Sequence, residues 1–180
     1  DHVIWRLPKG QEVRLRDPRR FGAVLWVEGG PADHKLLRHL GPEPLGNGFH
    51  ADWLYRRSRG RRIAIKSFIM GAAEVVGVGN IYASESLFRA GIHPTIRAGR
   101  VSKARYEALV SAIRAVLTQA IEAGGTTLRD FVRNDGEPGY FAQALAVYGR
   151  AGEPCPRCRK PISRRVIGQR STFYCTACQR

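Results

Sequence analysis

The sequence Cys155-Pro156-Arg157-Cys158, followed after sixteen residues by Cys175-Thr176-Ala177-Cys178, decides the architecture of the last part of the chain. A two-residue gap lets both thiolates of a pair face one ion, and the longer segment between the pairs can run out and back as a hairpin. Zinc binds four such soft donors as a tetrahedron, so the spacing predicts one zinc ion held by all four cysteines. Unpaired structural cysteines or two short-range disulfides are the alternatives. Because four ligands leave no open coordination position, the ion is expected to be structural.

The residues around these cysteines are strongly basic. Residues 150–180 contain eight Lys or Arg against the single acid Glu153, which leaves a charge of +7, and the whole chain carries +15. An ordinary solvated surface mixes both signs, so this density favours a polyanion, with nucleic acid as the leading candidate. An anionic membrane is the alternative, but no basic amphipathic helix of useful length supports it.

The composition is that of a globular protein. With 180 residues, of which 43% are hydrophobic, the chain can form one or two small domains in addition to the zinc module. No apolar run approaches the length of a transmembrane helix, and no signal peptide is visible. Thiolates kept free for zinc fit a reducing cytosol.

The first thirty residues are expected to form strands. Short runs rich in Val, Leu, Ile and Trp occupy Val3–Leu7, Glu12–Arg16 and Gly22–Val27, and Pro8–Gln11 is a good hairpin turn. Three strands alone would leave an exposed sheet edge, which proteins usually avoid. We therefore expect further sheet residues before Asp1.

From Pro31 onward the apolar residues follow helical spacing. A helix is expected at Leu36–Leu40, before the Gly41–Pro44 break, and another begins at Trp53. Ser102 is the predicted N-cap of a long helix that ends at Gly124-Gly125. Its apolar stripe comprises Tyr106, Leu109, Val110, Ile113, Val116, Leu117 and Ile121.

A glycine-rich turn, Val75-Val76-Gly77-Val78-Gly79-Asn80, is expected between two helices, the second of which starts at Asn80. Glycines permit a close approach of the backbone, and the exposed amides of a helix start suit a phosphate. Taken alone, the turn is weak evidence for a phosphate site, because a tight interhelical connection has the same sequence.

Several motifs together resemble bacterial formamidopyrimidine-DNA glycosylase, and the resemblance extends from Asp1 to Arg180. They are Asp17-Pro18-Arg19-Arg20-Phe21-Gly22, Val75-Val76-Gly77-Val78-Gly79-Asn80-Ile81-Tyr82-Ala83-Ser84-Glu85, Gly125-Thr126-Thr127-Leu128, Gly139-Tyr140-Phe141 and the four-cysteine module. The implied fold class is α+β: the C-terminal strands of a β-sandwich (residues 1–30), a helix-two-turn-helix DNA-binding domain (31–145) and a zinc-finger β-hairpin (146–180).

The function implied by the resemblance is base-excision DNA repair. The family excises oxidised purines such as 8-oxoguanine and formamidopyrimidines, and cleaves the abasic strand by β,δ-elimination. The implied partner is double-stranded DNA that contains oxidised purines or abasic sites, bound by a monomer in the bacterial cytoplasm, near the nucleoid.

Two residues are expected to occupy the space left by an extruded base. Arg19 matches the arginine that hydrogen-bonds the orphaned cytosine, and Phe21 matches the aromatic wedge inserted into the stack; a planar donor and an apolar plug suit that hole. On composition alone, Arg19-Arg20 would be an exposed pair at a strand end.

Arg62 matches a DNA-contacting lysine of the family, with Arg61 as the alternative.

The resemblance places three more residues at the phosphates beside the lesion: Lys66, Asn80 and Arg170. It also assigns Arg170 as the proton donor for δ-elimination. Because arginine is a poor acid at neutral pH, we expect Arg170 to act mainly by electrostatic stabilisation of the departing phosphate.

The segment Asn134–Tyr140 is rich in turn-forming residues and is expected to be mobile. In the family this region covers the damaged base, which gives Gly139 and Tyr140 an implied role there. Its likeness to the oxidised-purine branch is the reason for preferring that branch over endonuclease VIII, which prefers oxidised pyrimidines. An ordinary surface loop is the alternative.

The family's nucleophile is an N-terminal proline, followed by a catalytic glutamate, and these positions do not occur among residues 1–180. A Schiff base requires an unprotonated amine in the right place, which Asp1 is not expected to supply. The parent protein is therefore expected to be a bifunctional glycosylase and lyase, and this chain its DNA-binding fragment. A non-catalytic, zinc-dependent DNA-binding protein that begins near Asp1 is the second hypothesis.

Overall fold

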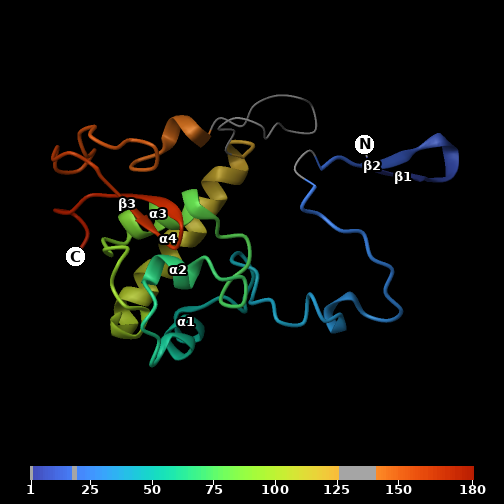
Figure 1. The fold of residues 1–180 in the computed structure, drawn as a ribbon, viewed down its shortest axis with the longest axis horizontal. Helices are drawn as coiled ribbons and strands as arrows, with labels where there is room; N and C mark the ends of the chain where they lie inside the picture. Colours follow the sequence, from blue (N-terminus) through green and yellow to red (C-terminus); the bar gives the residue numbers. More distant parts are fainter. Residues whose placement is uncertain (1, 18–19, 126–140) are drawn as a thin grey trace. The chain divides into compact units, whose positions relative to one another are not determined.

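The computed structural model describes residues 2–17, 20–125 and 141–180 (Figure 1). The chain divides into two compact units, residues 1–38 and residues 39–180. The fold class is α+β, as predicted, with helices concentrated in the second unit and a strand hairpin in each. The expected domain boundaries after residues 30 and 145 stay predictions.

Where the structure describes it, the first unit contains one antiparallel hairpin. Strand β1 (Val3–Arg6) pairs with β2 (Glu12–Leu15), and a short 3-10 turn, Pro8–Gly10, joins them as the sequence predicts. The third predicted strand is wrong, because residues 22–27 form no strand within the part of the chain that the structure describes. A strand needs a neighbour to accept and donate its backbone hydrogen bonds, and local propensity does not provide one.

The predicted helix at Leu36–Leu40 is also wrong. The segment contains a 3-10 turn at Pro31–Asp33 followed by hydrogen-bonded turns, and the three leucines are between 41% and 60% exposed. Most helical stability comes from packing an apolar face, and these leucines have little to pack against.

The described residues of the second unit contain four α-helices: α1 (Ala51–Ser58), α2 (Ile65–Ile69), α3 (Asn80–Arg89) and α4 (Lys103–Glu122). Two short 3-10 helices, Ala98–Arg100 and Phe141–Ala144, accompany them. The predicted N-cap is confirmed, since Ser102 Oγ accepts a hydrogen bond from the backbone N–H of Arg105 at 3.4 Å.

The apolar stripe of α4 faces the core, with one exception. Its residues from Tyr106 to Leu117 in the predicted set are buried, whereas Ile121 is 65% exposed and Ala120, 2% exposed, packs into the core from the same turn. Tyr106 is fully buried and its hydroxyl donates to Ala98 O at 3.0 Å. Burial raises the pKa of Tyr106 to about 12.

The segment between the cysteine pairs forms the expected hairpin. Strand β3 (Ser163–Ile167) pairs with β4 (Arg170–Tyr174), and Ile167 lies opposite Arg170, so Gly168 and Gln169 form a two-residue turn. Both have positive φ, 55° and 60°, as a type I′ turn requires. The hairpin packs beside α3 (Figure 1). A side chain at Gly168 would be only 3.1 Å from Ser67 Oγ of α2, so the turn approaches that helix closely.

Among the described residues, no helix has both the length and the apolar character that crossing a membrane requires.

Candidate metal centre and nucleic-acid interface

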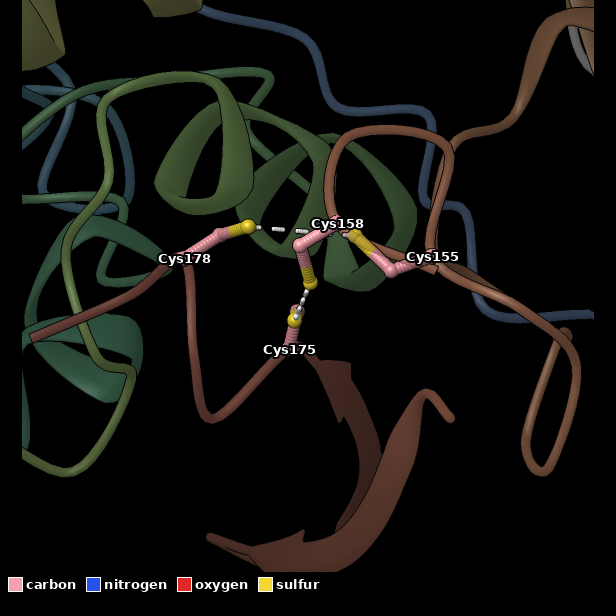
Figure 2. Close-up of side chains that lie close together, drawn as sticks. All are labelled: Cys155, Cys158, Cys175 and Cys178. Carbon is pink, nitrogen blue, oxygen red and sulfur yellow. Dashed lines mark hydrogen bonds between the residues drawn. The ribbon is translucent and has the colours of Figure 1, made fainter. Parts of the chain in front are cut away.

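The four cysteine sulfurs converge on one point between the two pairs (Figure 2). All four Sγ atoms lie within 4.8 Å of one another, with Cys155 and Cys178 at 3.9 Å and Cys158 and Cys175 at 3.4 Å. Four thiolates bound to zinc at tetrahedral geometry would be separated by about 3.8 Å, given a Zn–S distance of roughly 2.3 Å. The donor set therefore fits one structural zinc ion, and the predicted ligands are confirmed as a cluster.

The metal centre is anchored to the helices by a buried polar side chain, Gln179, which is 1% exposed. Its Oε1 accepts from the backbone N–H of Cys175 at 2.8 Å, and its Nε2 donates to Ile92 O at 2.9 Å, just beyond α3. Arg157 adds a second link, because its guanidinium lies 4.6 Å from the ring centroid of Phe88 and donates to Arg89 O. The zinc centre and α3 are thus held in one compact unit.

Helix α3 begins at Asn80, as predicted, directly after the glycine-rich turn. Gly77 has φ of 75°, a conformation that favours glycine, and a Cβ at Gly79 would meet nothing within 4 Å. Since Gly79 is the N-cap and gives no side-chain cap, the start of α3 presents backbone amides that suit an anion.

Lys66 on α2 and Asn80 meet the hairpin at this point. Lys66 is 1% exposed, and its ammonium donates to Asn80 Oδ1, to Thr172 Oγ1 at 2.7 Å and to Ser171 O at 3.4 Å. Asn80 Nδ2 in turn donates to Ser171 O at 3.0 Å and to the hydroxyl of Tyr148 at 3.2 Å. The structure therefore brings two predicted site residues together with strand β4.

Arg170, the first residue of β4, is exposed and close enough to Lys66 to influence its titration. Burial, and then the positive charge of Arg170, lower the pKa of Lys66 to about 8. Within the described chain, no carboxylate forms an ion pair with either cation. Two neighbouring cations without an acid form a site that favours an anion.

Arg62 and the alternative Arg61 are both exposed on a short segment that runs antiparallel to residues 97–99. The backbone of this segment is held by hydrogen bonds from Gly99 N to Arg61 O and from Ala98 N to Ile63 O. Both side chains can reach solvent, so the structure does not choose between them.

In the first unit, Phe21 is 80% exposed. The loop that carries it is closed by Asp17, whose Oδ2 accepts from the backbone N–H of Gly22 at 2.5 Å. Arg19, Gly139 and Tyr140 lie outside the described residues, and their expected roles stay predictions.

Sequence reasoning missed the role of Glu85. Its carboxylate is 6% exposed and accepts three backbone N–H groups, from Ala146 at 2.9 Å, Val147 at 2.9 Å and Tyr148 at 2.8 Å. These hydrogen bonds hold the backbone of Tyr148 in place, and the ring of Tyr148 packs edge-on against Phe173 of β4 at 4.9 Å between centroids. The only available signal was an acid on a helix whose neighbours are small or apolar.

Two family models match the chain. The formamidopyrimidine-DNA glycosylase H2TH domain matches residues 40–132, and the zinc finger found in FPG and IleRS matches residues 152–180. Together they include the helices, the glycine-rich turn and the four cysteines.

Curated relatives match the chain over its full length. The formamidopyrimidine-DNA glycosylases of Syntrophotalea carbinolica and Alcanivorax borkumensis are 63% and 62% identical over 180 residues, which is 100% of this chain and 66% of each relative. The chain therefore spans slightly less than two thirds of these relatives.

Solved structures of the same family also match the chain. The MutM (Fpg) protein of Thermus thermophilus matches 95% of this chain and 65% of its own, with a TM-score of 0.86 and 40% identity. The Lactococcus lactis Fpg in complex with DNA containing an abasic site matches 81% of this chain and 53% of its own, with a TM-score of 0.75 and 32% identity. With its helices, its zinc centre and these matches in agreement, the chain belongs to the formamidopyrimidine-DNA glycosylase family.

Proposed function

We propose that this chain is the DNA-binding part of a base-excision repair enzyme. The parent protein excises oxidised purines, such as 8-oxoguanine and formamidopyrimidines, and cleaves the abasic strand by β,δ-elimination. The bound partner is double-stranded DNA carrying such a base or an abasic site, and the protein acts as a monomer in the bacterial cytoplasm, at the nucleoid.

One observation carries the proposal: the start of α3, the exposed guanidinium of Arg170 and the ammonium of Lys66 lie together without an acidic partner among the described residues. A helix start beside an exposed guanidinium is a phosphate-binding arrangement, and the buried ammonium of Lys66 adds to its positive potential. The net charge of +15 extends the attraction over the whole chain, as binding to a polyanion requires.

The roles within the site follow from side-chain chemistry. Arg170 can bind the phosphate beside the lesion by two parallel N–H donors and stabilise charge on it as it departs. Asn80 and Lys66 belong to the same site, and Arg62 contacts phosphate farther along the duplex. Phe21 fills the gap left by the extruded base while Arg19 hydrogen-bonds the orphaned cytosine. Gly139 and Tyr140 cover the damaged base.

The zinc ion supplies no chemistry in this proposal. Its four cysteine ligands leave no position for a substrate or a water, so it stabilises the hairpin that presents Arg170. The nucleophilic amine lies outside residues 1–180, in the remaining third of the parent protein.

Borohydride trapping on a duplex with an abasic site tests which part of the parent protein supplies the nucleophilic amine. We expect a covalent adduct with a protein that carries the family's N-terminal proline and glutamate ahead of this sequence, and none with residues 1–180 alone. An adduct with residues 1–180 at comparable yield would show that another amine does the chemistry.

A further inference from the structure

Lys66 is an unusual residue because it is a lysine buried to 1% exposure without a carboxylate partner in the described parts of the chain. Removing an ammonium from water is costly unless other groups replace its hydration. Such a residue is retained where its hydrogen bonds hold elements together or where it meets a ligand.

The hydrogen bonds of the Lys66 ammonium show whether it holds elements together or meets a ligand. A lysine ammonium has three N–H donors, and Lys66 directs them at three acceptors, Asn80 Oδ1, Thr172 Oγ1 and Ser171 O. The first acceptor lies on α3 and the other two on β4. All three donors are used within the chain, and none remains for a phosphate oxygen.

The same bonds fix the orientation of Asn80. With its Oδ1 facing Lys66, its Nδ2 points to Ser171 O and to the hydroxyl of Tyr148. Tyr148 is itself held by Glu85 and by the ring of Phe173. The network thus connects α2, α3 and β4 directly beneath the turn that precedes Arg170.

We propose that Lys66 is a positioning residue, which locks the zinc hairpin onto α2 and α3 through Asn80 and Thr172 and does not itself bind a DNA phosphate. This inference rests on the proposed DNA-binding function, because what it positions is the phosphate-binding end of β4. Arg170 and the start of α3 remain the groups that touch DNA.

The test compares Lys66→Met, which keeps the alkyl chain and removes the ammonium, with Lys103→Met. Lys103 lies on α4, is 54% exposed and pairs with Asp52 at 2.8 Å, away from the network. For each zinc-loaded protein, affinity for a duplex with an abasic-site analogue is measured from 50 to 200 mM salt, together with amide hydrogen exchange of residues 163–174.

For Lys66→Met we expect the slope of log affinity against log salt to stay at the wild-type value, while affinity falls by about tenfold or more and hairpin amides exchange at least about tenfold faster. A slope reduced by about 0.9, the value for one lost phosphate contact, with unchanged hairpin exchange would overturn the proposal. Lys103→Met should leave hairpin exchange unchanged.

If Lys66→Met does not fold, Thr172→Val provides the second variant, since it removes the nearer of the two acceptors on the hairpin and keeps a similar shape. We expect the same faster exchange of residues 163–174 with an unchanged salt slope. Wild-type exchange in Thr172→Val would contradict the positioning role. Failure of the wild-type chain to bind DNA would instead refute the proposed function, and hairpin exchange would still test the role of Lys66 in positioning.

Discussion

Replacing Arg170 by alanine should separate DNA binding from folding. Arg170 begins β4, is exposed and has no ion-pair partner among the described residues, so its removal should change the free energy of unfolding by no more than about 0.5 kcal/mol. It also relieves the repulsion that helps to lower the pKa of Lys66. The zinc ligand Cys175 follows the far end of the strand, so the metal should stay bound.

The loss in binding can be estimated from the chemistry. A hydrogen bond to a charged group contributes about 1.5–3 kcal/mol, which corresponds to roughly 10- to 150-fold in affinity for an abasic-site duplex. Removing one phosphate contact should also lower the slope of log affinity against log salt by about 0.9.

Fluorescence anisotropy over a salt series measures both quantities, and metal analysis with thermal unfolding provides the controls. Lys103→Ala is the matched control, because it also removes one positive charge but does so at the ion pair with Asp52. Its slope of log affinity against log salt should change much less than that of Arg170→Ala. Loss of zinc in Arg170→Ala, or wild-type affinity and slope, would refute the assignment of Arg170 to the phosphate site.

Three further predictions concern the metal, the wedge and pH. Chelating zinc should unfold roughly the last thirty residues and abolish most DNA binding, seen as lost amide protection there; retained binding would exclude the hairpin from the interface. Phe21→Ala should weaken binding to an abasic-site duplex more than to undamaged duplex, because only the abasic duplex has a gap that the 80% exposed ring can fill; equal losses would contradict the wedge role. The pKa of Lys66 falls from 10.5 in the unfolded chain to about 8 in the folded one, so above pH 8 the unfolded chain binds more protons. The free energy of unfolding of the wild type should therefore rise with pH, by up to about 1.4 kcal/mol per pH unit more than that of Lys66→Met. Denaturant titrations from pH 8 to 9.5 stay below the usual Tyr106 pKa of 10.0, and parallel curves for the two proteins would contradict the lowered pKa of Lys66.

The features that sequence predicted correctly depend on local signals. The cysteine spacing, the Ser102 cap and the glycines before Asn80 each act within a few residues, and the structure places all three as expected. The family resemblance added the fold class.

The errors and omissions depend on distant partners. Residues 22–27 have strand composition, but a strand requires a neighbour, and Leu36–Leu40 has helical spacing without a surface to cover. The bond from Lys66 to Thr172 joins residues 106 positions apart, and those of Glu85 cross about sixty. No periodicity or motif in one sequence encodes such a pairing, so the network was visible only in three dimensions.

We propose that the hairpin tip and the start of α3 form a site for DNA phosphates beside a lesion. The decisive measurement is the affinity of the zinc-loaded chain for an abasic-site duplex and for its undamaged counterpart, over the same salt series with wild type and Arg170→Ala. We expect tighter binding of the abasic duplex, a steep salt dependence, and loss of most of that preference in Arg170→Ala. Equal affinity for the two duplexes, insensitive to salt and to Arg170, would contradict the proposal.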